Sequence, residues 1–209
     1  MNMHYPTDAE LLRAEIAALA ARMIAEEGAD YGAAKKRAAK QILGDARLRG
    51  DILPDNAQVE AEVRIYQELF FGETQPARLA HLRALAYRLM EDLQQFSPHL
   101  TGAVLQGTAG DHSDIHLQLF ADSPKDVEIW LLNKNMAFEV GETGHFKGRG
   151  FDAVETVSFM WHEEGVHLAL YQTDDLRGAL RSASGRTERA NLNAVRQLIS
   201  TPTKESPII

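Results

Sequence analysis

The 209-residue chain contains no cysteine, and this absence excludes several classes of site at once. Without thiols there are no disulfides, thiolate nucleophiles, iron–sulfur clusters or cysteine-based zinc sites. The chain also has no stretch approaching the roughly 18 consecutive apolar residues of a membrane-spanning helix. Residues 1–20 are interrupted by charged side chains, so they do not resemble a signal peptide. We therefore expect a cytoplasmic protein with no membrane partner.

Positive charge is in deficit. The chain has 22 lysine and arginine residues against 30 aspartate and glutamate residues, which gives a formal net charge of −8. This negative net charge argues against a protein that binds nucleic acid or anionic lipid over its whole surface. One local basic cluster stands out, formed by Lys35, Lys36, Arg37 and Lys40, with Arg47 and Arg49 beyond it. It indicates either a site for RNA or an acidic partner, or a solvated helix face.

The composition is that of an ordinary globular protein, with 44% hydrophobic and 25% charged residues. The pattern of apolar residues divides the chain into two regions. Residues 1–97 carry apolar side chains at helical spacing, whereas residues 98–209 mix alternating, strand-like runs with short helices. The sequence thus predicts an α+β fold, in which a helical N-terminal half packs on a small mixed β-sheet core.

Four helices are predicted in the first region, each ending at a helix-stopping residue. They cover about 8–27, 30–43, 55–71 and 76–95, and the first three end at Gly28, Gly44 and Gly72. The predicted inward face of the third consists of Val59, Val63, Tyr66 and Phe70. Pro98 ends the fourth, because the residue before a proline avoids the α region.

The second region predicts strands and connecting helices. Apolar runs at 100–107 and 113–120 indicate two strands, and Ser123 is predicted to cap a helix over 124–132. Runs at 153–162 and 166–172 flank a turn at Glu163–Gly165 and indicate a hairpin. A short helix is predicted from Asp174, and a last one from Thr187 to Ile199.

The segment GTAGDHSDIHLQL, residues 107–119, carries the most chemistry. Strand alternation puts Asp114 and His116 on one face, about 7 Å apart. Glycines and exposed N–H groups in such a turn form a cradle for phosphate, to which Gly107, Thr108 and Ser113 would contribute. The alternative is a tight turn between two strands, with its polar residues in solvent.

This segment resembles the signature of the DNA polymerase β-type nucleotidyltransferases. In that superfamily a glycine with serine or threonine follows the first strand, the second strand carries Asp-x-Asp, and a later strand carries a third acid. Gly107-Thr108, Asp114-Ile115-His116 and the strand around His167 stand in these places. The whole chain is further similar to a bacterial nucleotidyltransferase-like group, some members of which are labelled UDP-N-acetylmuramate–alanine ligases.

The resemblance implies a metal site with altered ligands. The superfamily uses three carboxylates to hold two Mg²⁺ ions that activate a hydroxyl and steady the leaving pyrophosphate of an NTP. Here Asp114 is retained, whereas His116 and His167 stand in the other two places. Two imidazoles and one carboxylate suit Zn²⁺ or Mn²⁺ better than Mg²⁺. Among other acids, Glu155 on a later strand is the best alternative ligand.

Two hypotheses for the function remain open. In the first, the chain is a divergent metal-dependent enzyme that transfers a nucleotide to an acceptor, with Asp114 as the surviving catalytic ligand. In the second, it is a catalytically inactive module of the same fold that binds a nucleotide, RNA or a protein.

A further candidate is the glycine-rich segment 144–150, which contains Lys147 and Arg149. It is either a phosphate-binding loop or a flexible connection.

Overall fold

The computed structural model describes residues 7–44, 52–148, 150–177 and 189–200. It confirms the α+β fold, with helices in the N-terminal half and a mixed six-stranded sheet in the C-terminal half. The chain forms two compact units, one of residues up to Arg78 together with Gly110–His112, the other of Leu79–Ala109 and the residues from Ser113 onward. Among the helices described, none combines the length and the apolar character needed to cross a membrane.

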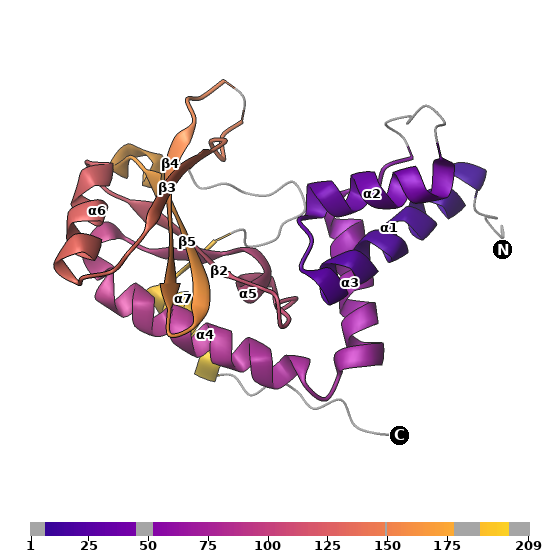
Figure 1. Ribbon diagram of the computed structural model, residues 1–209, viewed down its shortest axis with the longest axis horizontal. Helices are drawn as coiled ribbons and strands as arrows, with labels where there is room; N and C mark the ends of the chain where they lie inside the picture. The colour runs from indigo at the N-terminus through magenta and orange to yellow at the C-terminus, as the bar shows by residue number, and fades with distance from the viewer. Residues whose placement is uncertain (1–6, 45–51, 149, 178–188, 201–209) are drawn as a thin grey trace. The chain divides into compact units, whose positions relative to one another are not determined.

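The first unit is built from three helices, α1 (Asp8–Glu27), α2 (Tyr31–Leu43) and α3 (Asn56–Phe71) (Figure 1). Each begins at a side chain that accepts hydrogen bonds from the first-turn amides, and these caps are Thr7, Asp30 and Asp55. Buried apolar side chains from all three helices form one core, which includes Ile16, Ala20, Ala34, Ala38, Val59 and Val63. The predicted helix spans are therefore confirmed.

One face of α3 differs from the prediction. Val59 and Val63 are buried as expected, but Phe70 is 64% exposed. Its ring instead contacts that of Tyr66 one turn earlier, tilted by 36°, with ring centroids 4.5 Å apart. Helical spacing predicted that Phe70 faces inward, because it follows Val59 and Val63 at helical intervals. The buried part of α3 ends before Phe70, so the ring lies at the surface.

The helix α4 (Gln75–Asp92) carries the chain into the second unit. Its apolar side chains are buried along one face, and a 3-10 turn over Gln94–Phe96 follows. Ser97 then adopts a left-handed conformation, and the helical path ends before Pro98 as predicted. Most of α4, although part of the helical region predicted over 1–97, packs with the sheet.

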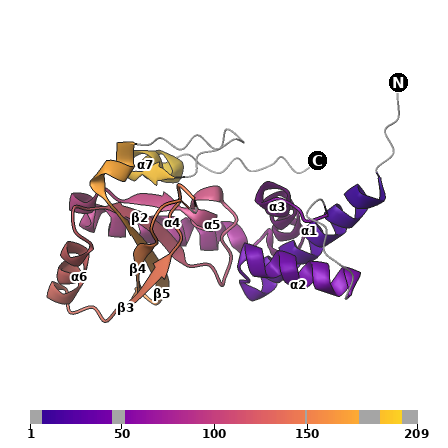
Figure 2. The ribbon, with the colours of Figure 1, turned by 90° about the horizontal axis from the view of Figure 1, so that it is seen from above.

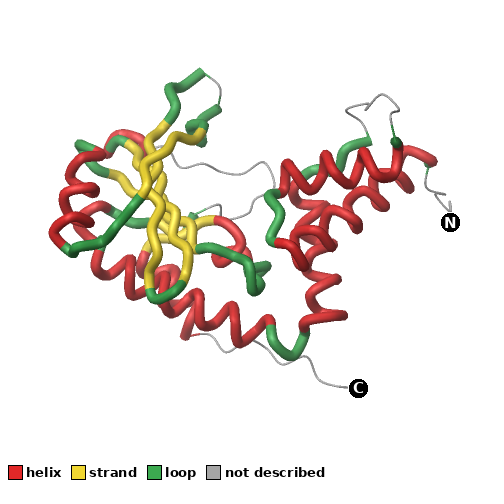
Figure 3. The backbone as a smooth tube through the Cα atoms, viewed as in Figure 1, coloured by secondary structure: helices red, strands yellow, loops and turns green. Residues whose placement is uncertain are grey.

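The sheet has the strand order β3-β4-β5-β2-β1-β6. Its strands are β1 (His99–Thr101), β2 (Ile115–Phe120), β3 (Glu139–Thr143), β4 (Val154–Trp161), β5 (Glu164–Tyr171) and β6 (Ala190–Asn191) (Figure 3). Neighbouring strands are antiparallel except β2 and β5, which are parallel. Two strands distant in sequence are thereby set side by side in the middle of the sheet.

One face of the sheet forms the core of the second unit. Alternate residues of β2 and β5 point to it, namely Ile115, Leu117, Leu119, Val166, Leu168 and Leu170. They pack with buried side chains of α4, α6 (Pro124–Asn133) and α7 (Leu192–Ser200), the last two of which are seen beside the strands in Figure 2. The alternation predicted for 113–120 is confirmed, because its polar residues occupy the opposite face.

Three predictions for this unit were wrong in detail. The run 100–107 is a strand only to Thr101 and continues as the helix α5 (Gly102–Gln106), since Gly102 has a positive φ of 68° that turns the chain. The side chain of Ser123 makes no capping hydrogen bond at the start of α6. The hairpin turn lies at His162 and Glu163, between β4 and β5, and not at Glu163–Gly165.

Other features of this unit agree with or extend the sequence analysis. The short helix near Asp174 is confirmed as a 3-10 helix, Thr173–Arg177. The strands β3 and β6 were not predicted, and the last helix begins at Leu192, after β6. Its predicted start at Thr187 lies outside the described residues.

Candidate functional site

The sheet face that points away from the core carries a row of polar side chains. In register across five adjacent strands lie Thr101, His116, His167, Ser158 and Glu139, which we call the polar row. Residues paired in register share a face, so each strand of the row contributes one side chain to the same surface. The parallel pairing of β2 with β5 is what brings the two histidines together.

Three side chains at this row are joined by hydrogen bonds. The carboxylate Oδ2 of Asp114 lies 2.9 Å from Nε2 of His167, and Nδ1 of the same ring lies 2.8 Å from the Oγ of Ser158. Asp114 immediately precedes β2, so three strands hold the three groups. Sequence reasoning identified Asp114 and His167 but missed Ser158, which depends on the register of the β4–β5 hairpin.

His116 stacks on this arrangement. Its ring and that of His167 are nearly parallel, with centroids 4.9 Å apart and an angle of 21° between their planes. Part of the His116 side chain remains exposed to solvent, but the surrounding protein atoms desolvate the rest of it. This desolvation, followed by repulsion from His167, lowers the pKa of His116, although Asp114 acts in the opposite sense. His116 is therefore a neutral ring at neutral pH.

A glycine makes room for the carboxylate. A Cβ atom at Gly165 would lie 2.3 Å from Oδ1 of Asp114, closer than atoms can approach. The strand β5 thus has no side chain at the place where Asp114 leans over it to reach His167. Only glycine at this position is compatible with the observed Asp114–His167 bond.

The residues of the predicted phosphate cradle lie between the end of α5 and the start of β2. Gly107 ends α5 in the left-handed region, with φ at 86°, and Thr108 is only 4% exposed. The adjoining residues 110–112 belong to the first unit, where Arg78 donates hydrogen bonds to the carbonyl oxygens of Gly110 and Asp111. Ser113 is partly buried before β2. A hydroxyl buried as deeply as that of Thr108 does not face a ligand in solvent.

The residues predicted as metal ligands lie together, but His167 is fully engaged. Both of its ring nitrogens take part in hydrogen bonds, so a metal would have to displace Asp114 or Ser158. Within the described ranges no group of three or more histidine, aspartate or glutamate side chains is arranged to hold a metal ion. The metal site therefore stays a prediction.

The alternative ligand Glu155 faces the other way. On β4 it alternates with Ser158 and lies on the opposite side of the sheet, close to Glu128 of α6. Burial, followed by a hydrogen bond from Glu128, raises the pKa of the Glu155 carboxyl. This carboxylate does not reach Asp114, and its assignment as a substitute ligand was wrong.

An unsatisfied acceptor lies beside the polar row. Gln118 is two residues beyond His116 on β2 and therefore on the same face. Its Oε1 atom is buried, and within the part of the chain that the structure describes it has no hydrogen-bond partner. Buried acceptors are nearly always paired in proteins, so this atom is an unpaired polar group next to the polar row.

A pocket of the second unit lies at the other end of the strands. It has a volume of about 510 Å³ and lies where β2 and β5 end, lined by Phe96, Phe120, Trp130, Asp122, Asp126 and Thr173 among others. At about 3.3 Å per residue this is about 20 Å along β2 from Asp114. The described residues that line it include no lysine or arginine, and its two aspartates would repel a phosphate group. The pocket is thus separate from the polar row.

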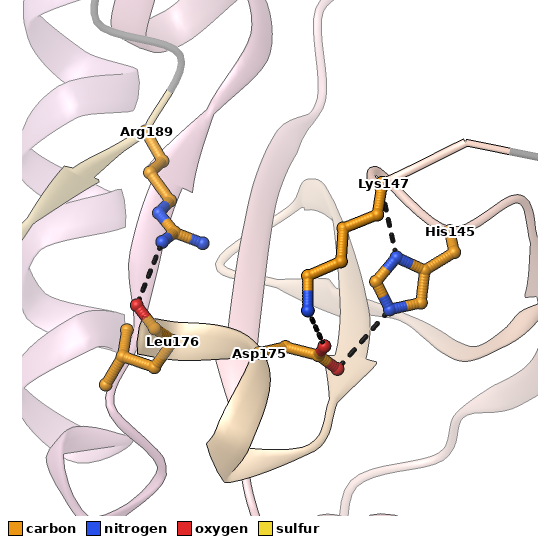
Figure 4. A network of polar contacts seen from close by, with 5 residues as sticks. All are labelled: His145, Lys147, Asp175, Leu176 and Arg189. Atoms are coloured by element: carbon orange, nitrogen blue, oxygen red, sulfur yellow. Dashed lines mark hydrogen bonds and ion pairs between the residues drawn. The ribbon is translucent and has the colours of Figure 1, made fainter. Parts of the chain in front are cut away.

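The predicted phosphate loop at 144–150 is held by an acidic side chain (Figure 4). Asp175 accepts hydrogen bonds from Lys147 Nζ and His145 Nε2, and the backbone N–H of Lys147 donates to His145 Nδ1. Burial tends to raise the pKa of the Asp175 carboxyl, but these two donors outweigh it and lower the pKa below the ordinary value. The positive charge of Lys147 is balanced by the Asp175 carboxylate, and this ion pair connects the loop to the 3-10 helix Thr173–Arg177. Arg149 lies outside the described residues.

The basic cluster of α2 is partly satisfied within the first unit. Lys35 donates to the side chain of Asn56, and Arg37 pairs with Glu27 at 2.9 Å. Lys36 and Lys40 lie on the exposed surface of α2, while Arg47 and Arg49 lie outside the described residues. Two of the four cations are thus held by neighbouring side chains, as on an ordinary solvated helix face.

Comparison with known proteins adds no relative. The chain matches no protein-family model, and neither the curated proteins nor the solved structures searched yield a match.

Proposed function

We propose that this chain is a nucleotidyltransferase-like module that binds a nucleotide on the polar face of its sheet and does not carry out two-metal nucleotidyl transfer. The observation that carries the proposal is the in-register pair His116 and His167 on the parallel strands β2 and β5. By the resemblance stated above, these places belong to metal-binding acids. The absence of cysteine fits a cytoplasmic setting for this activity.

The replacement of the acids removes the basis for metal-dependent transfer. Two Mg²⁺ ions need several hard oxygen ligands, and among the described residues Asp114 is the only carboxylate bonded to the two-histidine stack. Glu139 stands at the far end of the polar row, three strands from His116. Binding of the ligand is therefore expected to be independent of divalent metal.

Stacking favours recognition of the base over the phosphates. The polar row contains no lysine or arginine, and the chain is acidic overall. His116 offers a neutral, partly exposed ring, and bases stack on such rings in many nucleotide-binding proteins.

A thermal-shift titration tests this proposal. At a ligand concentration 100 times the dissociation constant, binding stabilises the native state by about 2.7 kcal/mol. For a chain of this length we expect the melting temperature to rise by roughly 5–10 °C with at least one of ATP, GTP, CTP or UTP. The same shift is expected in EDTA, because the site needs no metal.

A variant localises the ligand. His116→Leu removes the stacking ring while keeping a side chain of similar size, and should abolish the thermal shift. Gln94→Leu, at an exposed position of the 3-10 turn, should leave it unchanged. The proposal is wrong if none of the four nucleotides shifts the melting temperature. Transfer of label from an α-³²P-labelled NTP in the presence of Mn²⁺ would instead establish the transferase hypothesis.

A further inference from the structure

We propose that Ser158 is a nucleophile, activated by His167 as general base and positioned through Asp114, that attacks activated carboxylic esters. A nucleophile within hydrogen-bond reach of a base, with the base oriented by a third group, is the geometry that nucleophilic catalysis requires. Here the two distances are 2.8 and 2.9 Å. The inference does not depend on nucleotide binding.

The direction of each hydrogen bond follows from the chemistry of the groups. A carboxylate only accepts hydrogen bonds, so Nε2 of His167 must carry a proton and donate it to Asp114. In the neutral ring Nδ1 is then the acceptor, and the Oγ–H of Ser158 must donate to it. The serine proton therefore already points at the base that would remove it. If the proton were on Nδ1 instead, the Asp114 carboxylate would face the lone pair of Nε2, and no hydrogen bond could form between these two acceptors.

Two further contacts fix the ring of His167. Gly165 leaves the space that the Asp114 carboxylate occupies. The His116 ring stacks against His167 at 4.9 Å and restricts its rotation. Both act as positioning residues, because neither one is bonded to Ser158.

Access and the surroundings define the substrate class. The side chains of His167 and Asp114 are 39% and 44% exposed and Ser158 is partly exposed, so the three groups lie at a surface open to solvent. The strand β4 pairs with β3 on one side and β5 on the other, which engages the backbone N–H groups around Ser158 in the sheet. These groups cannot form an oxyanion hole. The site thus suits esters whose alcohol leaves readily, such as aryl esters of short acids.

The reaction proceeds in two balanced steps. Ser158 Oγ attacks the ester carbonyl carbon while its proton passes to His167 Nδ1. The bond to the alcohol oxygen then breaks, and the alcohol leaves with that proton. In the second step His167 takes a proton from water, whose oxygen attacks the acyl carbon. The carboxylic acid departs and Ser158 recovers its proton from His167. General-base catalysis of this kind contributes about 10²–10⁴-fold.

The test uses the full chain and p-nitrophenyl acetate. We expect release of p-nitrophenol with an initial burst, and acetylation of the peptide that contains Ser158, detected by mass spectrometry. Ser158→Ala should remove the burst and the label and reduce the rate by about 100-fold or more. Ser123→Ala, at a serine whose side chain makes no capping bond, should behave as the wild type.

A second variant separates positioning from folding. In Gly165→Ala the clash falls on the carboxylate of the Asp114 side chain, which can rotate away and give up its bond to His167. The melting temperature should therefore change little, while acylation slows by about tenfold or more, within the contribution of an oriented base. Nitrogen NMR of labelled histidine should show His167 as the Nε2–H tautomer in the wild type. Equal acylation of Ser158→Ala and wild type, absence of acylation in the wild type, or a Nδ1–H tautomer would each overturn the proposal.

Discussion

Replacing Gly28 with alanine is expected to lower the free energy of unfolding by roughly 2–5 kcal/mol. Gly28 ends α1 in the left-handed region, with φ at 67°, where an L-residue costs about 1–2 kcal/mol. A Cβ atom there would also lie 2.6 Å from the Cβ of His112. Because both atoms are fixed to the backbone, the chain must move, and such overpacking costs about 1–3 kcal/mol.

A control without the close contact is Gly44→Ala. Gly44 ends α2 with a positive φ of 62° but a ψ of −132°, outside the left-handed helical region, and nothing in the described structure lies within 4 Å of an added Cβ. It should therefore show only the cost of an unfavourable backbone conformation, about 1–3 kcal/mol. Urea unfolding followed by the helical circular dichroism signal measures both variants. A loss in Gly28→Ala of no more than about 1–2 kcal/mol, the conformational cost alone, would contradict the close approach of residue 112 to the end of α1.

Replacing Asp175 with alanine is expected to destabilise the chain by about 2–3 kcal/mol. This is the value of about one hydrogen bond to a charged group, because the partly exposed Lys147 can bond to water once its partner is removed. Lys147 and His145 both lose their acceptor, and the His145 side chain is only 7% exposed. The melting temperature should fall by roughly 5–10 °C. Asp174→Ala, at the exposed neighbouring carboxylate, should change it little.

The same variant should alter the dependence of stability on pH. Because the folded state lowers the pKa of Asp175, the carboxylate stabilises the fold above its unfolded pKa, near 3.8. This contribution is lost as the pH falls through the lower, folded value. The stability difference between wild type and Asp175→Ala should therefore be largest at neutral pH and shrink in acid. A difference that stays constant down to pH 3 would contradict the assigned network.

The helix boundaries could be predicted because the residues that start and stop each helix lie next to it in the sequence. Asp30 and Asp55 cap the starts of α2 and α3, and Gly28 and Gly44 end α1 and α2. A cap and its helix lie within a few residues, so no tertiary information is needed. The strand β3 has no such signal, since all five of its residues are exposed and two of them are glutamates. Its pairing with β4 depends on the tertiary fold.

The candidate site was predicted only in part, for the same reason. Alternation along one strand placed Asp114 and His116 on a common face, and the resemblance to a family pointed to His167. Ser158 required the pairing of two strands. The turn predicted at Glu163–Gly165 would have set Trp161 opposite His167, whereas the observed register sets Ser158 there.

The turn between β4 and β5 therefore determines which side chain of β4 lies beside His167 in the polar row. His162 and Glu163 form its two-residue loop, and both adopt positive φ angles, 49° and 67°, that residues other than glycine and asparagine rarely take. Since the length of a hairpin loop fixes the pairing of its strands, one inserted residue would slide β4 against β5. Ser158 would then turn to the buried side, and His167 would face a different neighbour. A change in the length of this loop would therefore separate Ser158 from His167, although neither residue had been replaced.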